Sequence, residues 1–255
     1  MSLELNKVYN GDCLTLMKEI KSESVDLILC DLPYAFTENK WDCLIPFDEL
    51  WQAYDRIIKP SGTVVLTACG KFTIQLINSN LKNYRYSWIW QKNNVTNFAN
   101  AKKQPLRDYE DVLVFYKRQG TYNPQGLTLL NKPKDKSKDK IGSSYDKPSL
   151  KTAYVQTHTG YPKSIIKFGR DKETFHPTQK PVALFEYLIR TYTNEGDVVL
   201  DNCSGAGSTA LASLNTNRNF ICIDLDKNYC DITHKRICEW NTIYKPIANS
   251  NSLSS

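Results

Sequence analysis

Short apolar runs alternate with helix-length amphipathic stretches along most of this sequence, and no other feature restricts its fold as strongly. Strands separated by helices pair in parallel, because each helix returns the chain to the same end of the sheet. We therefore predict an α/β fold with a doubly wound, mostly parallel sheet. The runs at 87–92 and 110–117 are expected to form two further strands, the second at an edge of the sheet.

The composition is that of an ordinary globular protein. With 255 residues the chain is long enough to bury most of its apolar surface. Its first residues lack a basic-then-apolar signal pattern, and no apolar run approaches the ~20 residues that cross a bilayer. We expect a cytoplasmic protein that does not associate with membranes. The eight cysteines form no C-x-x-C pair, which favours buried reduced thiols over zinc ligands or disulfides.

Positive charge is concentrated in one segment of the chain. Residues 131–172 hold eleven Lys and Arg against four Asp, whereas the whole chain has a net charge of +6. From Gly120 to Lys172 hydrophobic periodicity gives way to Pro, Lys, Ser and Gly, as in a long insertion. Such a segment is either a solvated loop or a surface that contacts phosphate groups. The last residues, 243–255, are expected to form a disordered tail.

The sequence "DVVLDNCSGAGSTALAS" at 197–213 predicts a strand, a turn of small residues and a helix. Gly205 and Gly207 allow a sharp turn and the close approach of a ligand. Asp224 ends the next strand, where a carboxylate can accept hydrogen bonds from ribose hydroxyls. The turn lacks both G-x-G-x-x-G and a Walker lysine, so S-adenosylmethionine (SAM) fits better than a dinucleotide or a nucleoside triphosphate. A plain tight turn is the alternative.

A second motif follows the apolar run that ends at Cys30. The residues Asp31-Leu32-Pro33-Tyr34 resemble the (D/N/S)-P-P-(Y/F/W) catalytic motif of the amino DNA methyltransferases, which methylate adenine N6 or cytosine N4 from SAM. Leu32 departs from the usual proline, at a position expected to offer mainly its backbone. The resemblance implies that these four residues form the catalytic motif.

Four further segments carry the same resemblance. "VVLDNCSGAG" at 198–207 is similar to the SAM-binding motif of that family, and "HPTQKP" at 176–181 to the segment beside the methionine end of SAM. "NGDC" and "WIWQKN" match in place and type. A catalytic motif that precedes the cofactor motif is the permuted order of the β class. The resemblance thus implies the seven-stranded type of methyltransferase sheet, circularly permuted, with a basic insertion.

The chemistry of an aromatic amine explains why such a motif is needed. Its lone pair is delocalised into the ring, so the enzyme has to hold the nitrogen in a geometry that frees it. Asp31 and the backbone carbonyl of Leu32 can each accept a hydrogen bond from the amine, and Tyr34 can stack on a base that has left the duplex. In the family Asp at the first position is typical of adenine enzymes and Ser of cytosine-N4 enzymes. No cysteine follows a proline, which argues against cytosine-C5 chemistry.

The resemblance and the cofactor turn together give a set of expected cofactor-binding residues. These are Asp12, Cys13, Asp31, His176, Thr178, Lys180, Asp201, Asn202, Ser204, Gly205, Gly207, Ser208, Thr209 and Asp224. Asp12 is expected to face the adenine of SAM, and Lys180 its carboxylate. The other histidines, His158 and His234, have no partners at metal-ligand spacing, so no metal is expected.

We predict a site-specific DNA (adenine-N6) methyltransferase that forms S-adenosylhomocysteine. Residues 1–119 would be its catalytic half, 120–172 its target-recognition insertion and 173–242 its SAM-binding half. Double-stranded DNA would be contacted by Trp41, Lys102, Lys103, Arg107, Lys132, Lys134, Lys136, Lys138 and Lys140. Phe36 is an alternative to Trp41 as the second wall of the base pocket, and Arg118 extends the basic surface.

Several alternatives stay open on the sequence alone. They are a cytosine-N4 DNA methyltransferase, a methyltransferase of RNA or of protein glutamine, and a methyltransferase-fold protein that binds nucleic acid without catalysis. A homodimer and a cognate restriction endonuclease are both compatible with the sequence. The DNA recognition site does not follow from it, because base readout depends on side-chain geometry in the insertion.

Overall fold

The computed structural model describes residues 3–34, 44–135 and 155–251. Contacts within the chain divide it into two compact units. The larger unit consists of residues 1–123 and 164–255, and the smaller one of residues 124–163.

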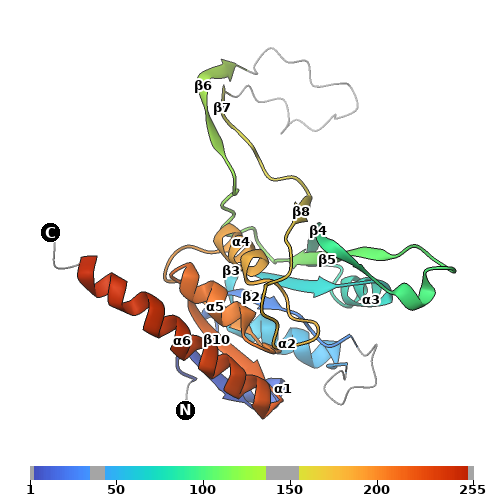
Figure 1. The fold of residues 1–255 in the computed structure, drawn as a ribbon, viewed down its shortest axis with the longest axis vertical. Coiled ribbons are helices and arrows are strands. Elements are labelled where there is room, and N and C mark those ends of the chain that lie inside the picture. Colours follow the sequence, from blue (N-terminus) through green and yellow to red (C-terminus); the bar gives the residue numbers. More distant parts are fainter. Residues whose placement is uncertain (1–2, 35–43, 136–154, 252–255) are drawn as a thin grey trace. The chain divides into compact units, whose positions relative to one another are not determined.

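The described part of the larger unit is a sheet covered by helices (Figure 1). Its helices are α1 (Cys13–Met17), α2 (Phe47–Ile57), α3 (Lys71–Ser79), the 3₁₀ turn η1 (Phe98–Asn100), α4 (Val182–Tyr192), α5 (Ser208–Asn215) and α6 (Lys227–Asn251). Its strands are β1 (Lys7–Asn10), β2 (Val25–Cys30), β3 (Ile58–Ala68), β4 (Tyr84–Thr96), β5 (Arg107–Phe115), β8 (Ile165–Lys167), β9 (Val198–Asp201) and β10 (Asn219–Asp224).

The strands form one eight-stranded sheet in the order β1-β10-β9-β2-β3-β5-β4-β8. β1, β10, β9, β2 and β3 pair in parallel. β5 runs antiparallel to both of its neighbours, and β8 pairs with β4 in parallel. The sheet is therefore mostly parallel, as predicted.

Both faces of the sheet are buried at its centre, which is why β2, β9 and β10 are apolar runs rather than alternating ones. Along β2, Ile28 and Cys30 pack in one core cluster with residues of α1, α2 and α3. Leu27 and Leu29 point to the other face, into a cluster with residues of α4 and α5. This arrangement, with helices on both faces, is the doubly wound fold that the sequence predicts.

The predicted position of one strand was wrong. The run at 110–117 was expected at an edge of the sheet, but its strand, β5, lies between β3 and β4. Val112 to Phe115 are all buried, which an interior strand requires and an edge strand does not. β8 adds an eighth strand to the seven expected, and it comes from within the predicted insertion.

The smaller unit is built on a two-stranded antiparallel ribbon of β6 (Thr128–Asp135) and β7 (Val155–Thr159). Gly126 and Gly160 approach closely, since a Cβ on Gly160 would lie 2.4 Å from the carbonyl oxygen of Gly126. The predicted insertion, residues 120–172, is thus wider than this unit, because β8 pairs with the main sheet.

The last helix, α6, continues to Asn251. The disordered tail expected for 243–255 overlaps the end of this helix and stays a prediction. Extending an existing helix costs less than starting one, because nucleation is the unfavourable step.

Among the residues described, the cysteines are free, no group of side chains could hold a metal ion, and no helix is long and apolar enough to cross a membrane.

Candidate active site

Four parallel strands carry acidic residues at their carboxyl ends, and these residues meet at one pocket. Asp12 and Asp31 follow β1 and β2, while Asp201 and Asp224 end β9 and β10. Ligands of open α/β sheets bind at this edge, outside the carboxyl ends of the strands. The pocket has a volume of about 550 Å³, and all four carboxylates line it.

Asp31 is the centre of a hydrogen-bond network in this pocket. Its Oδ1 accepts hydrogen bonds from the hydroxyl groups of Thr67 and Tyr34, the latter at 2.8 Å. Its Oδ2 accepts one from the ammonium group of Lys180. A carboxylate oxygen can accept about two hydrogen bonds. Among the described residues, Oδ2 therefore keeps room for one donor from a ligand.

Lys180 is a buried cation between two carboxylates. Its side chain is 6% exposed, and Nζ contacts Asp31 and lies 3.4 Å from Oε2 of Glu110. Oε1 of Glu110 pairs with Lys92. Burial alone would lower the pKa of Lys180, but the two carboxylates raise it above the ordinary lysine value. Lys180 was expected to face the carboxylate of SAM, whereas the structure places its Nζ on Asp31.

The other three residues of the catalytic motif differ in their surroundings. The side chain of Leu32 is buried in the core cluster beside α2, so leucine at the usual proline position fills the core. Pro33 and Tyr34 both line the pocket. The ring of Tyr34 stacks on Phe72 with 4.6 Å between centroids, which fixes its orientation.

The turn after β9 is held by the carboxylate of Asp224. Oδ2 of Asp224 accepts a hydrogen bond from the backbone N–H of Gly205 at 2.7 Å, and burial raises the pKa of this carboxyl group. Gly205 has a φ of +48°, a conformation that glycine adopts without strain. Ser204 also lines the pocket, and its Oγ is buried without a hydrogen-bond partner in the described part of the chain.

Three residues that were predicted to bind the cofactor have structural roles in this turn. They are Gly207, Ser208 and Thr209, and of these three only Ser208 lines the pocket. Thr209 is fully buried and donates a hydrogen bond to Oδ2 of Asp201. Gly207 has a φ of +79°, and a Cβ there would lie 2.3 Å from the methyl group of Thr233. Ser208 lines the pocket and donates from its hydroxyl to the backbone carbonyl of Lys180 at 2.7 Å. Burial raises the pKa of Asp201 to about 7.

Asp12 and Cys13 line the pocket just after β1, and Asn202 lines it just after β9. Asp12 caps α1, because its Oδ1 accepts a hydrogen bond from the backbone N–H of Thr15 at 2.8 Å. Oδ1 of Asn202 accepts one from the hydroxyl group of Tyr54 at 2.6 Å. A hydrogen bond with the Cys203 thiol lowers the pKa of Cys13.

His176 and Thr178 lie on the other side of the pocket, in the segment before α4. Nδ1 of His176 accepts a hydrogen bond from the backbone N–H of Thr178 at 3.1 Å, which puts the ring proton on Nε2. Burial lowers the pKa of His176, so the imidazole is neutral at pH 7. The ring lies 4.5 Å from that of Tyr229.

The predicted DNA-contacting residues fall into several places. Lys102 and Lys103 are exposed, and Arg107 lines the pocket with its Nη1 3.0 Å from the sulfur of Cys69. Lys132 and Lys134 are exposed on β6. The remaining predicted residues lie outside the described part of the chain: Phe36, Trp41, Lys136, Lys138 and Lys140.

Sequence reasoning missed Thr67, Lys92 and Glu110. A signal for Glu110 exists, since it continues the buried face of Val112 and Val114 along β5. Charged residues are almost never fully buried unless they are paired. An acidic residue at an inward strand position therefore indicates a buried partner, here the two lysines.

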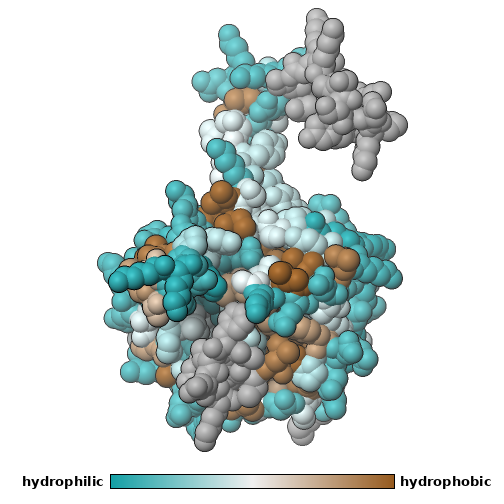
Figure 2. Space-filling model, turned by 90° about the vertical axis from the view of Figure 1, so that its right-hand side faces the viewer, coloured by the Kyte–Doolittle hydropathy of each residue, from teal (hydrophilic) through white to brown (hydrophobic). Residues whose placement is uncertain are grey.

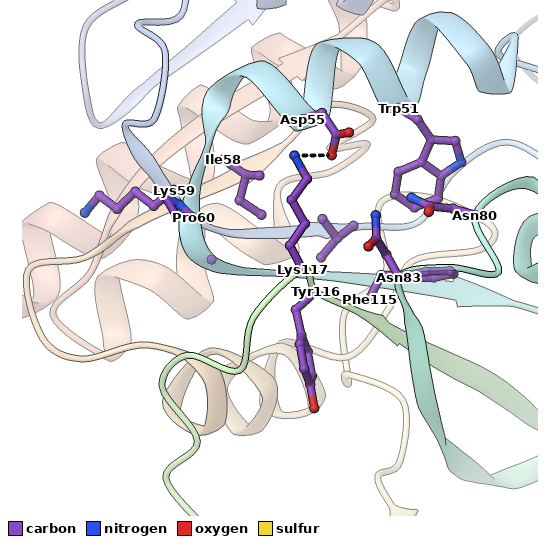
Figure 3. A pocket seen from close by; sticks show the side chains of 12 residues that line it. Trp51, Asp55, Ile58, Lys59, Pro60, Asn80, Asn83, Phe115, Tyr116 and Lys117 are labelled. Carbon is purple, nitrogen blue, oxygen red and sulfur yellow. Dashed lines mark ion pairs between the residues drawn. The ribbon is translucent and has the colours of Figure 1, made fainter.

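A second hollow lies at the opposite end of β3 and has no such chemistry. Its volume is about 20 Å³, and Lys117 and Asp55 form an ion pair of 3.1 Å beside it (Figure 3). A space of that size holds about one water molecule. We therefore assign ligand binding to the large pocket.

Comparisons with known proteins agree with this assignment. A family model described as DNA methylase, for the N6/N4 enzymes, matches residues 25–235. "DNA adenine methyltransferase YhdJ" of Escherichia coli (strain K12) is 27% identical over 260 residues, which cover 92% of this chain and 83% of YhdJ. "Type II methyltransferase M.HinfI" of Haemophilus influenzae is 30% identical over 286 residues, which cover 98% and 72%.

Solved structures show the same likeness. The crystal structure of the M1.HpyAVI–SAM complex matches with a TM-score of 0.63 at 26% identity, over 90% of this chain and 98% of that one. The PvuII DNA methyltransferase (cytosine-N4-specific) has a TM-score of 0.66 at 16% identity, over 91% and 86%, a likeness of fold alone. The predicted fold class and family resemblance are confirmed. The chain belongs to the N6/N4 DNA methylase family.

Proposed function

We propose that this methyltransferase moves a methyl group from SAM to the N6 amine of an adenine that is flipped out of double-stranded DNA. One observation carries the proposal: the carboxylate of Asp31 and the turn at Gly205 line the same pocket at the carboxyl edge of the sheet. The carboxylate of Asp31 suits the target amine, and the turn at Gly205 suits an adenosine-containing cofactor. SAM supplies an electrophilic methyl group when it is bound.

The residues of the pocket suit SAM as a ligand. Asp12 and Asp224 offer carboxylate oxygens, and Ser204 lines the same pocket. Leu14 and Phe185 provide apolar walls. A pocket with apolar walls and a few convergent polar groups is typical of cofactor sites. The assignment of the fourteen predicted cofactor residues stays a proposal.

Asp31 would act on the amine by accepting a hydrogen bond at Oδ2, the oxygen that it shares with Lys180. Oδ1 already accepts from Thr67 and Tyr34, so the carboxylate cannot rotate without losing these bonds. A fixed acceptor draws the nitrogen toward tetrahedral geometry, in which its lone pair is free to attack. The backbone carbonyl of Leu32 would accept the second hydrogen bond.

Adenine is proposed over cytosine because the catalytic motif begins with Asp. Lys132 and Lys134 in the smaller unit, and Lys102 and Lys103 in the larger one, would contact phosphate groups of the duplex. The cytoplasm is the proposed location, and a restriction endonuclease that reads the same site is a proposed partner.

Mass spectrometry of nucleosides tests the target base directly. Purified protein, SAM and plasmid DNA should yield N6-methyladenine. N4-methylcytosine would assign the other amine, and no methylated nucleoside with any DNA, in the presence of bound SAM, would favour a protein that binds without catalysis. Methyl transfer to RNA or protein but not to DNA would overturn the proposed substrate.

A further inference from the structure

The β4–β5 hairpin extends past the rest of the sheet as a two-stranded arm, residues 93–109 (Figure 1). Thr96 pairs with Arg107 across this arm. Both of these residues also line the active-site pocket. The end of the arm, residues 97–104, therefore begins at the wall of the pocket.

Hydrogen bonds within residues 97–104 give this end of the arm a defined shape. Asn97 has a φ of 74°, and its Oδ1 accepts a hydrogen bond from Nδ2 of Asn100 at 2.8 Å. The backbone N–H of Lys103 donates to the carbonyl of Asn100 at 2.8 Å. Phe98 is the first residue of the 3₁₀ turn η1, and its backbone carbonyl accepts a hydrogen bond from the N–H of Ala101 at 3.1 Å.

Phe98 is 68% exposed on this turn. Figure 2, which faces the side of the molecule toward which the arm points, shows small apolar groups set among hydrophilic residues. A large exposed aromatic side chain on an ordered turn next to a pocket suits a binding role, because exposure leaves its apolar surface in water.

The composition of the arm indicates what Phe98 contacts. Residues 93–109 contain five Asn and Gln, three Lys and Arg, and one acidic residue, Asp108. Lysines contact phosphate groups, amides can bond to base edges, and an aromatic ring stacks on bases or inserts between them. A basic or purely apolar partner would not match this set of side chains, whereas a DNA duplex matches its lysines, its amides and its aromatic ring.

We propose that Phe98 inserts into the duplex next to the target base and stacks on the bases left behind when that base enters the pocket. The inference rests on the proposed function and adds the residue that stabilises the flipped state. Flipping costs the stacking and pairing of the target base. Contact with an inserted aromatic ring offsets part of that cost.

Two DNA duplexes distinguish a role of Phe98 in base flipping from a general contribution of Phe98 to activity. One carries the normal target base pair, and the other has an abasic site opposite the target base, which makes flipping easier. We expect Phe98→Ala to lower kcat/KM about 10- to 100-fold on the paired duplex, the range for removal of one base–aromatic stack. On the abasic duplex the decrease should be small, and Phe98→Trp should keep most of the activity on both.

Leu81→Ala is the matched control. Leu81 is 64% exposed between α3 and β4 and does not line the pocket, so its variant should behave as wild type. Circular dichroism and SAM calorimetry check that each variant folds. Wild-type activity of Phe98→Ala, or an equal decrease on both duplexes, would overturn the inference. So would a change of oligomeric state in sedimentation, which would assign Phe98 to a contact between copies.

The proposed function and this inference fail in different ways. If the wild-type protein transfers no methyl group to either duplex, the proposed function fails. If the wild type is active and Phe98→Ala matches it, the inference alone fails.

Discussion

The ammonium group of Lys180 donates a hydrogen bond to the carboxylate of Asp31, although the two residues are 149 positions apart in the sequence. The segment "HPTQKP", expected beside the cofactor, thereby reaches the catalytic motif. Glu110 lies on the other side of the same ammonium group at 3.4 Å. Lys180 therefore balances two carboxylates and fixes the position of Oδ2 of Asp31.

Replacing Lys180 by Met should lower the rate of methyl transfer far more than the affinity for SAM. Without the ammonium group, Oδ2 of Asp31 loses its fixed position, and removing one such hydrogen-bond donor typically costs about 10²- to 10³-fold in kcat.

Lys227→Met is the control, because Lys227 is 72% exposed and pairs with Asp231 on the surface of α6. Single-turnover rates and SAM calorimetry on both variants make the comparison. A large decrease of SAM affinity in Lys180→Met with an unchanged transfer rate would return Lys180 to the role that the sequence predicts.

The parts of the site that could be predicted are those encoded locally. Asp31, Gly205 and Asp224 each follow or end an apolar run, so a short stretch of sequence places them at the carboxyl edge of a parallel sheet. The contact between Lys180 and Glu110 could not be predicted, because it depends on which strands become neighbours. The order β3-β5-β4 follows from packing across the whole sheet, and for the same reason the edge position predicted for β5 was wrong.

Asp224→Ala should weaken SAM binding by roughly 1 to 3 kcal/mol, the cost of leaving polar groups without their acceptor. The structure adds a second reason, since Asp224 also holds the backbone N–H of Gly205. Calorimetry with SAM measures the change. Asp231→Ala, on the exposed face of α6, should bind as wild type does, and unchanged affinity in Asp224→Ala would show that the ribose lies elsewhere.

Asp201 should make the stability of the folded protein depend on pH. Burial raises its pKa from 3.8 to about 7, so the folded state keeps a proton that the unfolded chain releases. The free energy of unfolding therefore falls as pH rises from about 4 to 7 and levels off above that. In Asp201→Asn, the free energy of unfolding measured with urea should fall less between pH 5 and 7 than it does in the wild type, by about 1 kcal/mol or more. Asp55→Asn, at a 48% exposed site, is the control and should show the wild-type dependence of unfolding free energy on pH. The same wild-type dependence in Asp201→Asn would contradict the prediction.

Changing Lys132, Lys134, Lys136, Lys138 and Lys140 to Ser should weaken DNA binding on every sequence. The log–log dependence of affinity on salt should flatten by roughly 0.9 for each phosphate group that the protein no longer neutralises. SAM affinity should not change. Substituting Lys227 and Lys235, both exposed on α6, is the control. A wild-type salt slope in the five-lysine variant would place the basic surface on Lys102, Lys103 and Arg107 instead.

Asp31→Ala tests the central claim most directly, because the account assigns this carboxylate to the target amine and not to the cofactor. Single-turnover transfer to duplex DNA is measured with protein in excess, and SAM affinity is measured by calorimetry on the same sample. We expect SAM to bind with nearly wild-type affinity while no N6-methyladenine forms. Formation of N6-methyladenine at a rate near that of the wild type would contradict the account.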